Sequence, residues 1–458
     1  MENLNFVEEQ LETEKINKLI FLYSVPSVIG MLINSLYNII DQIFIGYKIG
    51  ILGTATTNIA FPITTICTAI SMLIGIGSAS NLNLLLGKKE HEKAGNVIGN
   101  AISLMILSGG LFSCFTLFFI EPILSIFGST EILSAFAKTY IRIIPFGIPF
   151  SIIASSGSQI IRADGSPIYS MICIIIGALL NIILDALLLF GLNLGIEGVA
   201  WATVISQFIS SLLVLFHFKK FKTFKLQPKY FRLKIWIIKK IASLGAGACI
   251  NQLCITVFQI VLNNSLVYYG ANSIYGSEIP LASVGVITKI NTILTALISG
   301  TSQGCQPIFS YNYGAQKYER LYETIKKAFF IVIGIGILAE IIFQVFPVQL
   351  VSLFGNGGDE YFEFSTKYLR IFMMMTFING IQFLAGNFLS SIGKATKGII
   401  AIILKQLVFL IPLLLILPHF WGINGIMYSG PIADAATAVA MLFLLYSELK
   451  KLKMQKNN

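Results

Sequence analysis

Long apolar runs dominate the chain, and each is long enough to cross a lipid bilayer. A membrane-spanning helix needs about 20 mainly apolar residues. Twelve such runs follow one another, separated mostly by short polar connections. They cover roughly residues 18–45, 54–82, 96–120, 136–158, 168–190, 196–217, 236–264, 280–307, 323–346, 364–389, 397–418 and 424–447. The pattern predicts an all-α integral membrane protein with twelve transmembrane helices.

The composition supports this fold class and argues against a soluble protein. Only 12% of the 458 residues are charged and 55% are apolar, whereas a soluble domain has roughly 25% charged residues. The six cysteines lie in or beside apolar runs without a CxxC pair, which is typical of buried thiols rather than disulfides or a zinc site. The acidic N-terminal segment, 1–18, lacks the basic region and cleavage site of a signal peptide, so we expect none.

The positions of Lys and Arg predict the orientation in the membrane. Of the 32 Lys and Arg residues, the large majority fall on the side that holds both termini. Positive loops stay cytoplasmic, so we expect both termini on the cytoplasmic side of the plasma membrane. The composition, rich in Ile, Lys and Asn, suggests a bacterial source. Topology and anionic lipid explain the net charge of +10, and we expect no nucleic acid partner.

Short sequence matches recur at a nearly constant offset, close to half the chain length. They pair Gly87 with Gly314, 127–128 with 354–355, 140–143 with 368–371, and 195–198 with 422–425. The repeat predicts two six-helix bundles, 1–217 and 236–458, joined by a basic cytoplasmic linker, 218–235. Because each half has an even number of spans, the halves share one orientation and are related by an axis along the membrane normal, around a central cavity.

A polar stripe marks the first apolar run. Asn34, Asn38 and Asp41 recur at i, i+4 and i+7, so they share one face of a helix, with Tyr37 beside them. An ionised aspartate in hydrocarbon is costly and normally faces a bundle interior or a water-filled cavity. We therefore interpret Asp41 as a functional residue, with a wet helix end as the alternative.

Polar residues in two further runs lie at a similar depth. Asn181 and Asp185 share a helix face at i, i+4. At 1.5 Å per residue, Asp41 and Asp185 lie roughly 8 Å inside the outer ends of their runs, and Thr203 lies roughly 10 Å inside. Such oxygens can coordinate Na⁺ or hold a proton between two acids. For Asn181 and Thr203, interhelical packing is an open alternative.

The second half has polar stripes but no matching carboxylates. One stripe contains Gln252, Thr256, Gln259 and Asn263, and another contains Asn379, Gln382 and Gly386. They suit either the wall of a solvated cleft or interhelical packing. Glu340 and Asp434 also lie within apolar runs and stay unassigned. Segment 386–395 is a poor match to a phosphate loop, and the three histidines lack metal-ligand spacing. We expect no enzyme activity, and energy from an ion gradient.

Several motifs together resemble the multidrug and toxic compound extrusion (MATE) family of cation-coupled antiporters over essentially the whole chain. They are Pro26, segment 38–46 (NIIDQIFIG), the Gly87 and Gly314 loops, segment 162–167 (RADGSP) and segment 195–203 (GIEGVAWAT). The resemblance implies two bundles around a cavity that opens alternately to each side. It implies export of organic cations or other amphiphilic drugs against H⁺ or Na⁺, without another cofactor.

The resemblance also implies roles for individual residues. Asp41, Asn181, Asp185 and Thr203 match a cation site, which is a possible Na⁺ site, and the first helix would bend at Pro26 as a hinge. Some branches of the family have carboxylates in the seventh and tenth spans. This chain differs from them, because Gln259 and the Asn379 region are neutral.

The resulting hypothesis is a multidrug antiporter in which an ion at Asp41 and Asp185 drives substrate release. The substrate pocket is predicted to contain Asn34, Tyr37, Asn38, Asn181, Thr203 and Gln207. We expect a monomer whose partners are membrane lipid and small-molecule drugs or toxic organic cations. A flippase for lipids or lipid-linked oligosaccharides of the same superfamily is the alternative, and a membrane enzyme or receptor is a third class.

Overall fold

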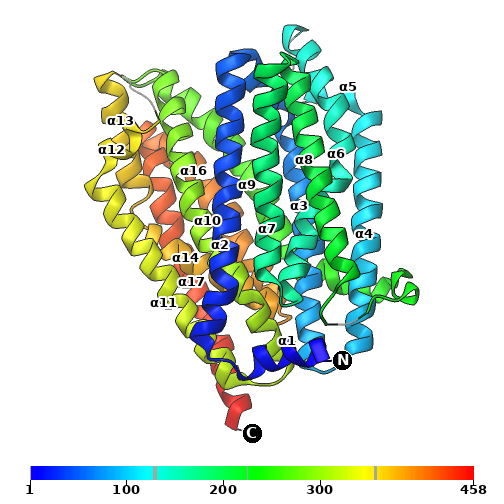
Figure 1. Cartoon of the computed structure of the whole chain (residues 1–458). Coiled ribbons are helices and arrows are strands. Elements are labelled where there is room, and N and C mark those ends of the chain that lie inside the picture. The colour runs from blue at the N-terminus through cyan, green and yellow to red at the C-terminus, as the bar shows by residue number, and fades with distance from the viewer. Residues whose placement is uncertain (1, 127–130, 224, 355–357, 458) are drawn as a thin grey trace.

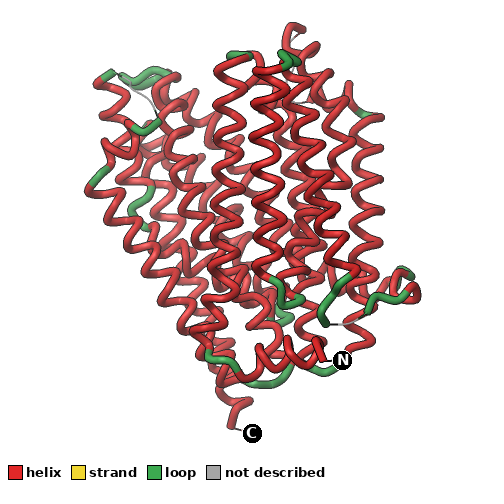
Figure 2. The backbone as a smooth tube through the Cα atoms, viewed as in Figure 1, coloured by secondary structure: helices red, strands yellow, loops and turns green. Residues whose placement is uncertain are grey.

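The computed structural model describes residues 2–126, 131–223, 225–354 and 358–457, and these residues form helices without any strand (Figure 2). The first half contains α1 (Glu2–Thr13), α2 (Ile16–Lys48), α3 (Ile51–Gly87), α4 (His91–Phe118), α5 (Ile120–Ile126), α6 (Glu131–Ala163), α7 (Pro167–Asp185), the π-helical turn η1 (Ala186–Gly191) and α8 (Gly195–Lys219). A short 3₁₀ helix, η2 (Pro228–Phe231), lies between the halves.

The second half repeats the arrangement of long helices. It contains α9 (Ile235–Ala271), α10 (Glu278–Gly314), α11 (Tyr318–Val345), α12 (Pro347–Ser352), α13 (Asp359–Phe372), α14 (Thr376–Ser391), α15 (Ala395–Ile403), the π-helical turn η3 (Leu404–Leu410), α16 (Ile411–Trp421) and α17 (Ile423–Asn457). Eleven spans of the described chain are long and apolar enough to cross a membrane, and the bent pair α13 and α14 completes twelve. The predicted helical class and span number are confirmed.

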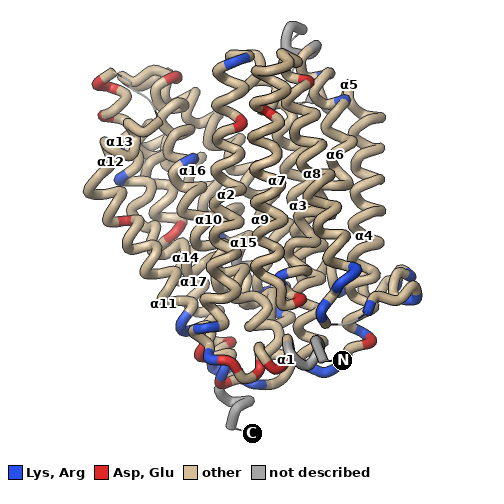
Figure 3. The backbone as a smooth tube through the Cα atoms, in the orientation of Figure 1, with Lys and Arg blue, Asp and Glu red and all other residues tan. Residues whose placement is uncertain are grey.

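Both termini lie at the same end of the helical bundle, which we call the terminal end (Figure 1). Lys and Arg residues gather at this end, whereas the middle of the bundle carries few charges (Figure 3). This is the separation that the positive-inside pattern predicts. One continuous cluster of buried apolar side chains includes residues of both halves, so the two bundles share a core.

The apolar run 364–389 suggested a single straight helix for the tenth span, but the structure shows a bend there. The span bends by 49° between α13 and α14, and a side chain of α11 satisfies a backbone group near the break. Gln344 Nε2 donates to the Arg370 carbonyl oxygen at 2.9 Å and to Glu340 Oε1 at 2.7 Å. Glu340, unassigned from sequence, therefore orients the Gln344 amide that binds the backbone near this helix break.

Two repeat-related glycines bring the halves into backbone contact at the terminal end. A Cβ added to Gly87 would lie 2.2 Å from the Tyr311 carbonyl oxygen, and one added to Gly314 would lie 2.3 Å from the Leu84 carbonyl oxygen. Leu84 and Tyr311 are related by the same offset as the two glycines, so the two contacts are counterparts. Only glycine permits so close an approach, and this crossing of α3 and α10 forms a seam between the halves.

We expect Gly87→Ala to separate α3 from α10 at the terminal end. The new methyl group would overlap a backbone oxygen that cannot rotate away, and overpacking of this kind costs about 1–3 kcal/mol. Double electron–electron resonance between nitroxides at positions 88 and 316 should show a longer distance. Gly334→Ala on α11, where an added Cβ meets no atom within 4 Å, should leave that distance unchanged. Equal distances in all three proteins would contradict the seam.

The short helix α1 lies across this seam and binds the second half through Glu12. The Glu12 carboxylate accepts from Lys317 Nζ at 2.5 Å and from the Tyr311 hydroxyl at 3.3 Å. Arg320 Nη2 donates to the Glu14 carbonyl oxygen at 2.6 Å. On the first-half side, Glu8 lies 3.4 Å from His91. Sequence patterns assigned no role to this acidic segment, but the structure places it as a strap over both halves.

Glu12→Gln is expected to loosen the strap at neutral pH. The hydrogen bond from Lys317 holds the pKa of the Glu12 carboxyl below its ordinary value of 4.5. A lowered pKa means that the stabilisation is present above pH 4.5 and is lost as pH falls through the folded-state pKa. A nitroxide at position 13 should therefore be more mobile in the variant at pH 7, and in wild type only below about pH 4.5.

Exposed Glu9 provides the matched control for this experiment. Glu9→Gln removes the same charge from α1 and should leave the nitroxide as immobile as in wild type. A pair this accessible is worth about 1 kcal/mol or less, so the mobile fraction should rise a few-fold. Identical spectra for the Glu12 and Glu9 variants would refute the role of Glu12.

Candidate functional site

Two buried carboxyl groups from different helices meet in the first half. Asp41 lies seven residues before the end of α2, and Asp185 is the last residue of α7. The two carboxyl groups lie close enough to interact electrostatically. Both Asp185 oxygens and Asp41 Oδ1 are buried without an N–H or O–H donor among the described residues. Because two ionised carboxylates here would repel each other, the pair needs a shared proton or a bound cation.

The local backbone explains why Asp185 lies at this position. The π-helical turn η1 begins at the next residue, and such turns widen a helix and are frequent at functional sites. Within η1, the Phe190 ring packs edge-on against Phe44 of α2, with 5.4 Å between ring centroids. This aromatic contact fixes the end of α7 against α2 and so keeps both acids at one level.

Asn181 connects the acid pair to a polar cavity. It lies one turn before Asp185 on α7, it is buried, and neither its Oδ1 nor its Nδ2 has a hydrogen-bond partner in the described chain. Thr203 of α8 donates its hydroxyl to the Val199 carbonyl oxygen at 3.1 Å, which leaves the hydroxyl oxygen able to accept. Both residues line a cavity of about 210 Å³ between α2, α3, α6, α7 and α8.

The structure brings most of the predicted substrate residues to this cavity. Its lining includes Asn34, Tyr37, Asn181, Thr203 and Gln207. Asn38 is not part of the lining: it is exposed and donates to the Asn34 carbonyl oxygen at 2.7 Å. The two acids lie beside the cavity rather than in its wall, and the lining residues Tyr37 and Asn181 lie one helical turn before them. Pro26 is buried within α2, which continues as one helix through it.

Arg162 is a cavity residue that the sequence placed in a cytoplasmic loop. It is 3% exposed and lines the cavity near the end of α6. Its Nη1 lies 3.4 Å from Gln303 Oε1 on α10, and Gln159 Nε2 donates to the same oxygen at 3.0 Å. These contacts close the cavity towards the terminal end and join the two halves. No sequence signal identifies Gln303, because it lies on a helix of the other half of the chain.

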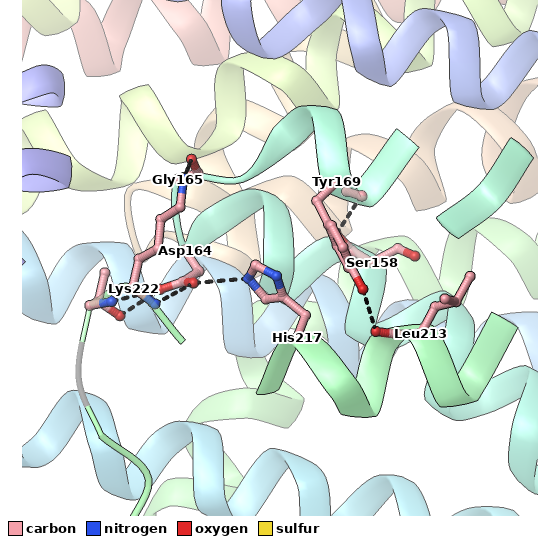
Figure 4. A network of polar contacts seen from close by, with 9 residues as sticks. Ser158, Asp164, Gly165, Tyr169, Leu213, His217 and Lys222 are labelled. Atoms are coloured by element: carbon pink, nitrogen blue, oxygen red, sulfur yellow. Dashed lines mark hydrogen bonds and ion pairs between the residues drawn. The ribbon is translucent and has the colours of Figure 1, made fainter. Parts of the chain in front are cut away.

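A buried aspartate below the cavity anchors the chain that follows α8 (Figure 4). Asp164, completely buried, accepts from the backbone N–H groups of Lys222 and Thr223 at 2.9 Å each and from the Thr223 hydroxyl at 2.8 Å. Its Oδ2 also lies 3.2 Å from His217 Nε2. The start of the basic linker is therefore tied to the turn between α6 and α7.

The arrangement of oxygens fits a small cation or a proton. Among the described residues, no group of three or more His, Cys, Asp or Glu side chains is placed to hold a metal ion. Asp41, Asp185 and the side-chain Oδ1 of Asn181 offer oxygens that have no hydrogen-bond donor in this part of the chain. Such oxygens suit a weakly held hard cation or one shared proton. Exchange of such an ion changes the charge of a site that adjoins the cavity.

Two pseudo-symmetric six-helix bundles with a polar cavity and a buried acid pair define a multi-pass membrane transporter. The family model described as MatE matches residues 26–187 and 245–416. The chain belongs to this family, as its motifs indicated. The multidrug export protein MepA from Staphylococcus saprophyticus subsp. saprophyticus is 28% identical over 98% of both chains. MepA from Staphylococcus aureus strain MSSA476 is 28% identical over 96% of both.

Solved structures match over nearly the whole length as well. The MATE multidrug transporter DinF-BH, solved in complex with rhodamine 6G, shares 34% identity and a TM-score of 0.87, covering 95% of this chain and 96% of that chain. An outward-facing multidrug resistance MATE transporter of the MOP superfamily superposes with a TM-score of 0.90, covering 97% and 98% of the two chains. At 22% identity, the second match supports the fold alone.

Proposed function

We propose that this chain is a secondary active multidrug exporter that exchanges organic, often cationic, amphiphilic substrates for H⁺ or Na⁺ by alternating access. The observation that carries the proposal is the buried acid pair, Asp41 and Asp185, of which Asp41 Oδ1 and both Asp185 oxygens lack donors within the described part of the chain and which lies beside a polar cavity. Relatives described as multidrug export proteins, and a solved relative in complex with rhodamine 6G, support the substrate class.

The proposed coupling uses the charge of the acid pair. An ion that enters from the end opposite the termini neutralises Asp41 and Asp185, with Asn181 and Thr203 as neutral oxygen donors when the ion is Na⁺. Loss of the negative charge weakens the attraction for a cationic substrate in the adjoining cavity. A bend of α2 at Pro26 then changes the cavity shape and releases the substrate. Proline removes a helix hydrogen bond and so lowers the cost of that bend.

The same proposal assigns an orientation and an environment. Positive charge at the terminal end supports a cytoplasmic location for both termini in a bacterial plasma membrane. Membrane lipid surrounds the bundle, and the functional unit is a monomer because each chain carries its own cavity and acid pair. Strap α1 and the glycine seam then form the cytoplasmic closure.

Purified protein in liposomes tests the function. Rhodamine 6G movement is followed after an imposed Na⁺ step at clamped pH and, separately, after a pH step without Na⁺. Transport driven by either step supports the exporter and identifies its ion. A fluorescent phospholipid in the same liposomes reports lipid flipping. Gradient-independent lipid movement without dye transport would reject the exporter in favour of a flippase, and movement of neither would reject both.

A further inference from the structure

A second polar cavity, of about 150 Å³, lies mainly within the second half. One of its lining residues, Lys405, forms an ion pair with Asp434 just outside the lining, and the proposed coupling does not use this pair. Lys405 Nζ lies 2.8 Å from Asp434 Oδ1 and donates to Asn379 Oδ1 at 2.5 Å. The two charged side chains are 17% and 10% exposed. From sequence, Asp434 stayed unassigned and Asn379 was expected in a neutral region; the structure makes both partners of a buried ammonium.

The internal repeat shows what this pair replaces in the first half. Asp434 corresponds to Gln207 at the offset that relates Gly195 to Gly422, the glycines just before the bodies of α8 and α17. Gln207 lines the first-half cavity. The second half thus has a carboxylate where the first half has a neutral amide.

The first-half counterpart of Lys405 is a glycine. The turns before α7 and α15 contain Gly165 and Gly393, which both have positive φ angles, +77° and +83°. At the offset between these two glycines, Lys405 corresponds to Gly177, which also lines the first-half cavity. The second cavity therefore carries a tethered cation where the first has a glycine packed against Ser210.

Two buried amide oxygens in the second cavity lack donors. Gln382 and Gln406 are 8% and 9% exposed, both line the cavity, and neither Oε1 has a hydrogen-bond donor within the described ranges. Gln382 Nε2 donates to the Asp434 backbone oxygen at 3.0 Å, which leaves its oxygen as the unpaired atom. Gln406 belongs, with Lys405, to the π-helical turn η3. Buried acceptors without donors favour a ligand that supplies N–H groups.

We propose that the second cavity binds organic cations that carry N–H donors, such as guanidinium or protonated amine compounds. Asp434 supplies the counter-charge, Gln382 and Gln406 accept the N–H groups, and Lys405 is a tethered competitor that leaves Asp434 when the ligand enters. The role of this site in export rests on the proposed function, whereas binding itself does not. A quaternary ammonium lacks N–H donors, leaves both amides unpaired and binds roughly tenfold more weakly or worse.

Benzylguanidinium and benzyltrimethylammonium, which share the benzyl group, form a matched probe pair. Binding is measured by calorimetry on the full chain in lipid nanodiscs, in an Asp41→Asn background that isolates the second cavity. We expect benzylguanidinium to bind and to be preferred about tenfold or more. Lys405→Met should tighten its binding about tenfold by removing the competitor, and Asp434→Asn should abolish it. Equal binding of the two probes, or unchanged binding in Asp434→Asn, would overturn the proposal.

Lys405→Met leaves a buried carboxylate without its counter-charge and could misfold for that reason. A second variant therefore tests the site without removing the ion pair. Gln406→Leu keeps the ion pair and should remove most of the preference for benzylguanidinium; an unchanged preference would count against the site. The double variant Lys405→Met/Asp434→Asn restores neutrality and should elute as a monodisperse protein without binding. Absence of gradient-driven dye transport by the wild-type chain, with benzylguanidinium binding at the second cavity intact, would refute the proposed function and leave the second site standing.

Discussion

Asp41→Asn will reduce ion-driven substrate export by roughly 100-fold, to the level of protein-free liposomes, while the protein stays folded. The amide has nearly the same shape as the carboxylate but can neither bind a proton in the working range nor hold Na⁺ by charge. Its Nδ2 can also donate to Asp185, whose oxygens lack donors among the described residues of the native site. The variant therefore has one ionisable carboxyl group instead of two, cannot share a proton or hold Na⁺ between two carboxylates, and loses the change of charge that drives the cycle.

The measurement is gradient-driven rhodamine 6G transport in liposomes, normalised to the amount of inserted protein. Asp359→Asn is the matched control, because Asp359 is exposed at the start of α13 and its replacement removes one negative charge without touching the site. Asp185→Asn should have the same effect as Asp41→Asn. Unchanged export in Asp41→Asn would end the coupling mechanism, although the fold and family assignment would be unaffected.

Asp164→Ala should produce the largest loss of stability, about 3–5 kcal/mol. It would leave two backbone N–H groups, those of Lys222 and Thr223, and the Thr223 hydroxyl buried without their acceptor. Each unpaired buried donor costs about 1–3 kcal/mol. His217 would lose its carboxylate partner as well. The start of the linker would then detach from the turn between α6 and α7.

Thermal unfolding in nanodiscs and limited proteolysis of the linker are the measurements. Glu92→Ala is the control, because Glu92 forms an exposed ion pair with Lys229 of the same linker at 3.2 Å, worth about 1 kcal/mol or less. Asp164→Asn retains one acceptor oxygen and should fall between the two. A melting temperature for Asp164→Ala equal to that of Glu92→Ala would show that this network does not anchor the linker.

The candidate site in the first half was largely predictable because its signals are local. An aspartate in an apolar run is conspicuous, since hydrocarbon penalises charge, and helix periodicity places Asn34 and Tyr37 on its face. The structure places Asp41 near Asp185 and puts Asn181, Thr203 and Gln207 around one cavity. Asn38 failed to reach the lining because helix periodicity alone does not say where a cavity ends along the helix.

The polar contacts of the second half were not predictable, because each depends on how separate helices pack. Lys405 and Asp434 are conspicuous individually, but their pairing requires η3 and α17 to meet at one depth. Asp434 therefore stayed unassigned from sequence, and its partner Lys405 was not predicted. Likewise Glu340 has no polar stripe around it, since its partner Gln344 binds the Arg370 carbonyl oxygen near the break between α13 and α14, and sequence does not show that break.

The amino-acid sequence by itself determined the number of spans, the two-fold repeat and the separation of positive charge, because bilayer thickness, chain duplication and membrane insertion act on sequence directly. It also determined that a few acids had to be shielded from lipid. Only the tertiary structure decided which polar atoms are satisfied and which are not. That outcome depends on the depth and rotation of each helix against its neighbours, and these are set by close packing such as the Gly87 and Gly314 crossing.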